Sequence, residues 1–540
     1  MDTITTSLAL LVLVVLGGIL ERSTPVPVPR PLIQIGFGAI AGLVPHFRIA
    51  LDPEVFFLLL VPPLLFIDGW RIPADELYAD RWVIANMAFG LVVATVLAVG
   101  LFIVWLVPGL HPGLAFALAA ALAPTDPIAV TSIAQRVAIP RRMMNLLQAE
   151  SLLNDATGLI CLRFAVIFLL TGGFSLGVAS ATVLWVSIAG LAIGFGVTLA
   201  VVRVKTMIVA RIGEEPGAQT VISLLIPFVA YLAAEVVSAS GLFAAVAAGV
   251  AMSRAEASGA ALGSTRIQRS ATWDSVQFIA NGVVFVLLGD QLPTILARAR
   301  TSATQTGHHG VWWPLMLIFA IFAAMLVVRL VWVWANVILL RRGTRPDRLP
   351  VWRLIAATGL AGSRGAITFA GILSLPLVLS YGTALAERDL VILVAMGVIV
   401  LSLIAASIGL PLLLRDGTIA IAVEASGETA ARSASAVAAL AEITRIVALH
   451  TGPDERTGLY EAAAARVSSQ YLQRLDALGQ RTAGATEVKS DASVLRELQI
   501  AAVRAERRCV FQLRRQQTIG ADDARQLVRE LDLLEAHYES

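Results

Sequence analysis

The sequence has 540 residues, of which 57% are hydrophobic and only 15% are charged, with a net charge of +3. A chain this apolar cannot hide its side chains in a water-soluble core, so the solvent for most of it is lipid. The composition excludes a disordered chain and a soluble enzyme, and the small net charge offers no nucleic-acid-binding surface. Two cysteines, Cys161 and Cys509, are too few for a disulfide framework or a zinc site.

Thirteen apolar segments precede residue 416, and most have the roughly 20 residues that a helix needs to cross a bilayer. The first follows no basic residue and has no A-x-A cleavage site, so we expect a retained helix and not a signal peptide. The sequence predicts an all-α polytopic membrane domain over residues 1–415, with apolar segments near 5–20, 31–45, 53–68, 82–107, 112–134, 145–171, 178–202, 218–237, 240–253, 271–291, 312–340, 352–379 and 389–414.

Basic residues are concentrated in alternate loops between these segments. The loops after odd-numbered segments hold eighteen lysines and arginines, and the loops after even-numbered segments hold four. Because cytoplasmic loops carry the excess of basic residues, we expect the N-terminus outside and the C-terminal tail in the cytoplasm. The pattern predicts a multi-pass protein of the cell membrane.

A helix break is predicted in the fifth segment, where residues 123–127 read Ala-Pro-Thr-Asp-Pro. The two prolines remove backbone donors and disfavour a continuous helix, and Asp126 precedes the second of them. Asp126 either only caps the half-helix that follows or also serves a functional site, since an acid at the bilayer midplane is costly.

A second break is predicted in the twelfth segment, where three glycines, Gly359, Gly362 and Gly365, surround Arg364. The two breaks lie seven segments apart, which predicts two inverted six-helix repeats whose broken helices cross. Such paired interruptions are the best sequence indication of a transport site at the midplane, although two unrelated flexible segments would give the same pattern.

The sixth segment carries the polar run from Glu150 through Ser151 and Asn154 to Asp155. On a helix Ser151 and Asp155 share one face, with Gly158 a turn further on, and Glu150 and Asn154 form the adjacent stripe. Hydroxyl, amide and carboxylate oxygens suit a small alkali cation, and a carboxylate can also hold a proton. A site that takes either one gives exchange by alternating access; the alternative is a buried polar contact between helices.

Four more charges lie in apolar segments and therefore face a cavity or a partner. Arg163 either pairs with an acid or extends to the membrane interface. Glu235 and Arg329 are either ion-pair partners or charges on a cavity wall. The role of Asp68 remains open at this point.

These stretches together resemble the monovalent cation:proton antiporter-1 family, of the sodium/proton exchanger type. The likeness covers most of residues 1–415, and the Glu-Ser-Leu-Leu-Asn-Asp string is its most specific part. The matching stretches are residues 62–66, 124–127, 150–155, Glu235 with 240–241, 281–289 and 362–366.

The resemblance implies that Asp155 binds Na⁺ or K⁺ and a proton by turns. It implies that Asn154 marks the electroneutral, one-for-one branch of the family. It also implies that Asp126 neutralises half-helix dipoles and polarises the site, and that Thr125 and Ser151 offer oxygens to the cation.

The resemblance further implies a structural ion pair between Glu150 and Arg364. Many family members place a cation-binding glutamate where this chain has Ile67, so Asp68 beside it is a possible accessory ligand. The implied protein is a homodimer that exchanges Na⁺, or K⁺ or Li⁺, for H⁺ in pH homeostasis, with no cofactor and no enzymatic activity.

Residues 416–540 contain no long apolar run and are predicted to form a helical cytoplasmic tail, with amphipathic helices over 491–517 and 522–538. A regulatory or assembly role is expected from position alone. Two rivals remain: a K⁺/H⁺ exchanger on the same scaffold, and a membrane sensor acting through its tail. The acids beside two broken helices argue against the sensor.

Overall fold

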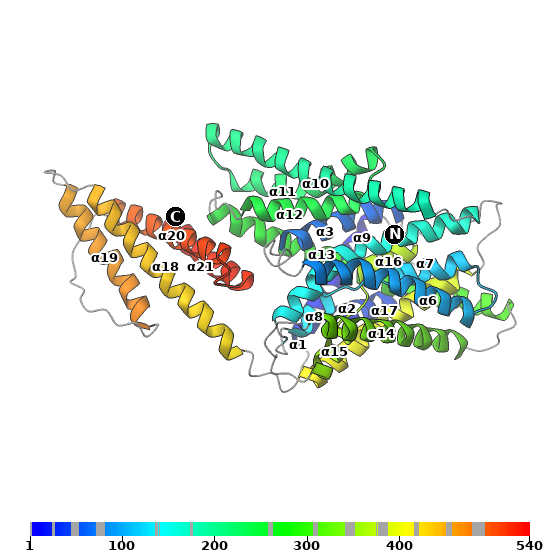
Figure 1. Ribbon diagram of the computed structural model, residues 1–540. Helices are drawn as coiled ribbons and strands as arrows, with labels where there is room; N and C mark the ends of the chain where they lie inside the picture. Colours follow the sequence, from blue (N-terminus) through cyan, green and yellow to red (C-terminus); the bar gives the residue numbers. More distant parts are fainter. Residues whose placement is uncertain are drawn as a thin grey trace. The chain divides into compact units, whose positions relative to one another are not determined.

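The computed structural model is helical throughout the part of the chain that it describes, without a strand there (Figure 1). In chain order, its helices are α1 (Thr3–Ser23), α2 (Arg30–Gly42), α3 (Pro53–Arg71), α5 (Arg81–Ala85), the π-helix η1 (Asn86–Leu91), α6 (Val92–Leu106), α7 (Pro112–Leu122), α8 (Ile128–Ala134), α9 (Arg141–Thr171), α10 (Leu176–Ile212), α11 (Pro216–Val236), α12 (Gly241–Glu256), α13 (Gly263–Gln305), α14 (Trp312–Leu340), α15 (Val351–Leu360), α16 (Ala366–Leu373), α17 (Arg388–Leu414), α18 (Ile421–Leu449), α19 (Arg456–Ala477), α20 (Ala492–Arg515) and α21 (Ala521–Glu539).

The structure describes residues 3–23, 28–44, 53–71, 81–134, 139, 141–172, 176–256, 263–305, 312–340, 351–373, 375, 387–414, 421–449, 456–477 and 492–539. The end of the predicted segment 352–379 lies partly outside these residues. Each predicted apolar segment overlaps a helix, and within the described ranges seven helices are long and apolar enough to cross a membrane. The all-helical membrane fold is confirmed, and the count of thirteen spans stays a prediction.

The chain divides into two compact units. The first contains residues 1–201, 225–252 and 274–418, and the second contains residues 202–224, 253–273 and 419–540. The divisions after residues 201, 224, 252 and 273 fall inside α10, α11, α12 and α13, so each of these four helices contributes to both units.

The first unit holds both predicted helix breaks. The fifth apolar segment forms α7, which ends at Leu122, and α8, which begins at Ile128. The twelfth segment forms α15, which ends at Leu360, and α16, which begins at Ala366. Helices α9 and α6 pack on α7, and α17 packs on α7, α8, α15 and α16.

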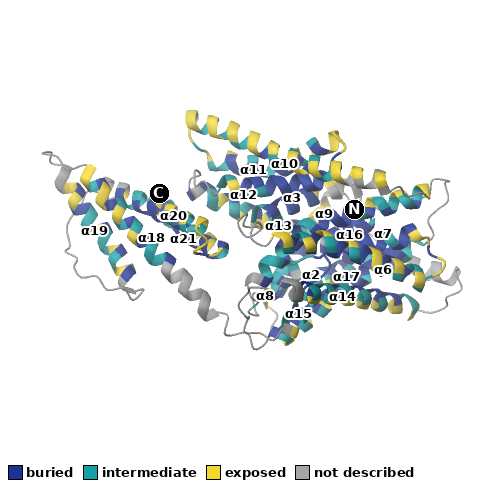
Figure 2. Cartoon of the chain, viewed as in Figure 1, coloured by how far each residue is buried: buried dark blue, intermediate teal, exposed yellow. Residues whose placement is uncertain are grey.

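Apolar side chains cover the outside of this unit as well as its interior. Helix α10 is the clearest case, because Leu184, Trp185 and Ile188 are each about 60% exposed. Figure 2 shows the exposed residues following one another along α10. A row of exposed apolar side chains on a long helix is what lipid, and not water, solvates.

Glycines allow α2 and α13 to cross with their backbones almost in contact. A Cβ added to Gly38 would lie 2.0 Å from the carbonyl oxygen of Val286, and one added to Gly289 would lie 2.1 Å from that of Ile35. Small residues at helix crossings are typical of membrane proteins, in which close packing replaces the hydrophobic driving force.

The second unit contains the tail helices. Its apolar side chains form two clusters, one around Ile443, Val467 and Leu498 and the other around Val510 and Leu527. The predicted helices 491–517 and 522–538 correspond to α20 and α21. Helices α18 and α20 pack together, as do α20 and α21.

We predict that Gly38→Ala destabilises the protein, because its new Cβ would collide with a backbone carbonyl that cannot rotate away. Overpacking of this kind costs about 1–3 kcal/mol. Gly36→Ala is the matched control on the same helix, since nothing lies within 4 Å of a Cβ there. Thermal unfolding of the detergent-solubilised protein measures the stability of both variants. Equal unfolding midpoints for Gly38→Ala and Gly36→Ala would contradict the close crossing of α2 and α13.

Candidate functional site

The two broken helices are joined to each other where their backbones are extended. The backbone N–H of Asp126 donates to the carbonyl oxygen of Ser363 at 2.7 Å, and the hydroxyl of Ser363 donates to the carbonyl oxygen of Asp126, also at 2.7 Å. A break in a membrane helix frees polar backbone groups that lipid cannot satisfy. Here each break supplies the partners for the other.

The carboxylate of Asp126 lies between the starts of two half-helices. Its Oδ1 accepts a hydrogen bond from the backbone N–H of Ile128 at 2.8 Å and so caps α8. A Cβ added to Gly365 would lie 1.7 Å from Oδ2 of Asp126, so glycine is required immediately before α16. A negative charge at two helix N-termini is stabilised by both helix dipoles.

The polar face of α9 is bound to the first break by a chain of buried hydrogen bonds. The amide of Asn154 donates to the hydroxyl of Thr125 at 2.9 Å, and this hydroxyl donates to Glu150 at 3.3 Å. Arg329, on α14, donates to both carboxylate oxygens of Glu150 at 2.5 and 2.9 Å. All four side chains are at least nine-tenths buried.

The predicted pairing of Glu150 with Arg364 is wrong in its partner, which is Arg329. Arg364 instead donates from Nε to the carbonyl oxygen of Leu122 at 3.1 Å and from Nη1 to that of Gly362. The two carbonyls lie at or just after the C-terminal ends of α7 and α15, where the helix no longer supplies an N–H partner for them. Arg364 therefore satisfies backbone carbonyls that the two helix breaks leave free.

Packing, and not the motif, selects Arg329 as the partner of Glu150. A Cβ added to Gly362 would lie 2.5 Å from Nε of Arg329, so this glycine admits the guanidinium. Nε also donates to the carbonyl oxygen of Thr358 at 3.2 Å. The sequence marked Arg329 as a buried charge but gave no sign of which acid it meets.

Asp155 and Ser151 lie one turn apart on α9, and both are buried. Helix α9 approaches the first break very closely, because a Cβ added to Gly158 would lie 2.3 Å from the ring of Pro124. The amide oxygen of Asn154 is buried and accepts no hydrogen bond from any described residue.

Three carboxyl groups lie near enough to one another for their charges to interact. The charge of Asp155 interacts repulsively with those of Asp126 and Asp68. Asp68 lies on α3 and interacts electrostatically with Asp126 and Asp155, while Ile67 is buried in the core, so an accessory role for Asp68 stays a prediction. Repulsion between neighbouring carboxylates is relieved when a proton or a cation binds.

The described residues contain no cluster of three His, Cys, Asp or Glu side chains arranged to hold a metal ion. The oxygens that the sequence offered to a cation are those of Ser151, one turn before Asp155 on α9, of Asn154, the residue before Asp155, and of Thr125, which Asn154 binds. Weak, mixed oxygen coordination suits an alkali cation better than a transition metal.

Arg163 and Glu235, left open by the sequence, form an ion pair away from this network. Arg163 on α9 lies 3.7 Å from Glu235 on α11, and both side chains are substantially exposed. Glu235 also accepts a hydrogen bond from the backbone N–H of Gly241. The pair links α9 to the α11–α12 corner.

Two crossed, interrupted helices and a buried acid on a third define a polytopic membrane protein of the antiporter class. The sequence matches the family described as sodium/hydrogen exchanger, transmembrane, over residues 10–416, and the chain belongs to this family. The family that the motifs indicated is thereby confirmed.

The relatives extend over different lengths of the chain. A protein of Escherichia coli (strain K12), named as an uncharacterized Na(+)/H(+) exchanger YjcE, is 36% identical over 99% of both chains. A sodium, potassium, lithium and rubidium/H(+) antiporter of Bacillus pumilus (strain SAFR-032) is 38% identical, over 75% of this chain and 60% of its own. The solved structure of the sodium proton antiporter MjNhaP1 from Methanocaldococcus jannaschii shares the fold, with a TM-score of 0.59, 16% identity and coverage of 77% of this chain and 99% of its own.

We predict that a double-mutant cycle assigns Glu150 to Arg329. Glu150→Gln leaves a buried guanidinium unpaired and costs about 3–5 kcal/mol. Arg329→Gln lowers the stability much less in the Glu150→Gln background than in the wild-type protein, because its partner Glu150 has already lost its charge. Adding Arg364→Gln to Glu150→Gln is closer to additive, within about 0.5 kcal/mol. Thermal unfolding measures the cycle, and a larger coupling to Arg364 would reverse the assignment.

Proposed function

We propose that the protein is a secondary active Na⁺/H⁺ antiporter in which a proton and the cation compete for Asp155. The observation that carries this proposal is the burial of Asp155 beside two crossed helix breaks, against the charges of Asp126 and Asp68. Because either a proton or a cation stabilises the site, the one that binds on a given side of the membrane displaces the other there. Alternating access then exchanges one for the other across the membrane.

The neighbours of Asp155 have separate roles in this proposal. Thr125, Ser151 and the amide oxygen of Asn154 supply neutral oxygens to the cation. One oxygen of Asp126 is occupied as the cap of α8, so this acid holds the breaks together and polarises the site. Glu150 forms a buried ion pair with Arg329 and has a structural role.

We propose one-for-one, electroneutral exchange, because Asp155 is the one acid of the motif at residues 150–155 that has no basic partner among the described residues, whereas Glu150 pairs with Arg329. Asn154 is uncharged, and its amide is engaged with Thr125. A single carboxylate that releases one H⁺ to accept one Na⁺ moves no net charge in a complete cycle.

We also propose that the protein is a homodimer of the cell membrane with its N-terminus outside and its tail in the cytoplasm. The eighteen-to-four division of basic residues supports this orientation. Exchange of Na⁺ for H⁺ in this setting contributes to pH homeostasis, and no enzymatic step is involved.

Asp155→Asn is predicted to abolish exchange, because an amide can neither release a proton nor balance the charge of a cation. The measurement is Na⁺-driven change of internal pH in proteoliposomes, followed with a trapped pH-sensitive dye. Asp389→Asn, the same chemical change in the first turn of α17, is the control and keeps wild-type exchange. Exchange by Asp155→Asn above the rate of empty liposomes would reject the proposal.

Electroneutrality predicts that a Na⁺ concentration jump drives no sustained charge movement through the protein. Solid-supported membrane recordings measure the translocated charge directly, with Asp155→Asn liposomes as the background. Charge that exceeds this background and grows with the Na⁺ gradient would rule out one-for-one exchange.

K⁺ is the second candidate cation on the same scaffold. Two features favour K⁺ as an alternative substrate: Ile67 stands where a cation ligand is expected, and the Bacillus pumilus relative is named for four alkali cations. The dye assay, run with Na⁺, K⁺, Li⁺ and Rb⁺ in turn, decides which cation the protein exchanges.

Because Asp68 adds negative charge to the site, Asp68→Asn is predicted to raise the half-saturating concentration of the preferred cation without abolishing exchange. The same dye assay measures this concentration.

A further inference from the structure

The half-helix α16 ends on an arginine that comes from the start of α17. Arg388 donates from Nε to the carbonyl oxygen of Leu375 at 3.1 Å and from Nη2 to that of Leu373 at 3.0 Å. Carbonyls at the end of a helix have no N–H partner within it, and the planar guanidinium can serve two of them at once. Arg388 therefore holds the main chain at the end of α16.

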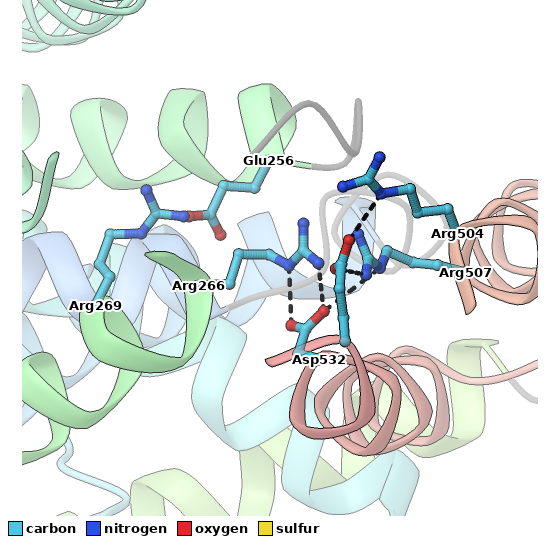
Figure 3. Close-up of polar contacts among 7 residues, drawn as sticks. Glu256, Arg266, Arg269, Arg504, Arg507 and Asp532 are labelled. Atoms are coloured by element: carbon cyan, nitrogen blue, oxygen red, sulfur yellow. Dashed lines mark hydrogen bonds and ion pairs between the residues drawn. The ribbon is translucent and has the colours of Figure 1, made fainter. Parts of the chain in front are cut away.

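Other buried arginines of the chain are bound differently, as Figure 3 shows for two of them. Arg266 faces Asp532 and Arg269 faces Glu256, so each guanidinium pairs with the carboxylate of another side chain. A pair of side chains can follow small movements of the helices that carry them. A guanidinium bound to two main-chain carbonyls leaves the helix that owns those carbonyls much less freedom.

The contact with α16 also explains the place of Arg388 in its own helix. Arg388 is the first residue of α17, and the dipole of a helix disfavours a positive charge at its N-terminus. At the C-terminal end of α16 the same charge is favourable. Asp389, which follows it, is the acid that the first turn of α17 favours. The arginine thus serves α16 and not α17.

Helix α17 holds the second broken helix at two separate points. At the break, the hydroxyl of Ser402 accepts a hydrogen bond from the backbone N–H of Arg364 at 3.0 Å. Arg388 lies about four turns earlier on α17 and holds the other end of α16. Because two separate contacts restrict both sliding and tilting, the position of α16 along α17 is defined.

Helix α16 touches the elements that carry all three carboxyl groups of the site. It packs on α3, which carries Asp68, and on α9, which carries Asp155. At its start, Gly365 lies directly against the carboxylate of Asp126. A shift of α16 would therefore change the packing beside each of the three acids.

We propose that Arg388 is a positioning residue for the proposed exchange: it sets the place of α16 and, through α16, the affinity of the site at Asp155 for its cation. The proposal rests on the proposed function, because it requires that a cation bind at Asp155. The reciprocal hydrogen bonds between Asp126 and Ser363 do not include Arg388, so the crossing of the two breaks survives its removal. Loss of Arg388 therefore weakens cation binding more than it slows the cycle.

The test measures initial rates of cation-driven pH change by the full chain in proteoliposomes, over a range of concentrations of the preferred cation. Arg388→Met removes the donors and the charge, and it is expected to raise the half-saturating concentration about tenfold, because two hydrogen bonds from a charged donor are lost. The maximum rate is expected to stay within about twofold of the wild-type rate. Arg388→Lys keeps the charge but lacks the planar fork, so a rise of about threefold is expected.

Two controls keep the wild-type half-saturating concentration. Asp389→Asn removes a charge from the same turn of α17, and Arg445→Met removes an exposed arginine that pairs within α18.

A purely structural role for Arg388 would reduce the amount of folded protein, and so lower the maximum rate at an unchanged half-saturating concentration. That result for Arg388→Met overturns the proposal. If Arg388→Met fails to fold, Arg388→Lys decides, and a wild-type half-saturating concentration for Arg388→Lys overturns the proposal. A wild-type protein that exchanges no alkali cation overturns the proposed function instead.

Discussion

The requirement that every backbone polar group within a membrane find a partner governs the site of this protein. Two helices are interrupted by prolines or glycines, and each interruption frees donors and acceptors that lipid cannot satisfy. The structure solves the problem reciprocally, through the Asp126–Ser363 hydrogen bonds and through Arg364, which serves the carbonyls of Leu122 and Gly362. The crossed breaks are stable only as a pair.

This solution also determines which charges remain for chemistry. Asp126 is partly used as a helix cap, Glu150 is neutralised by Arg329, and Arg364 is bound to backbone carbonyls. The carboxylate of Asp155 has no such basic partner among the described residues, and it lies within the repulsion of two other acids. Structural pairing of its neighbours thus leaves Asp155 as the acid that the proposed exchange depends on.

Much of this could be predicted from the sequence, because prolines, glycines and apolar runs act locally. The breaks at residues 123–127 and 362–365, the polar face of α9 and the helices of the tail all follow from short-range patterns. The partner of Glu150 could not, since Arg329 is 179 positions away and is admitted by the missing side chain of Gly362. The contact between Arg266 and Asp532 joins residues 266 positions apart, which no local pattern indicates.

The tight fit of Asp126 against Gly365 has a mechanical consequence. With no room for even a methyl group between them, the two half-helix pairs cannot slide or rotate against each other without breaking the hydrogen bonds that satisfy both. The crossing therefore behaves as one rigid piece. In the proposed exchange, an ion held at Asp155 would therefore move together with the crossing, and the distance that it travels would equal the shift of the crossing relative to the surrounding helices.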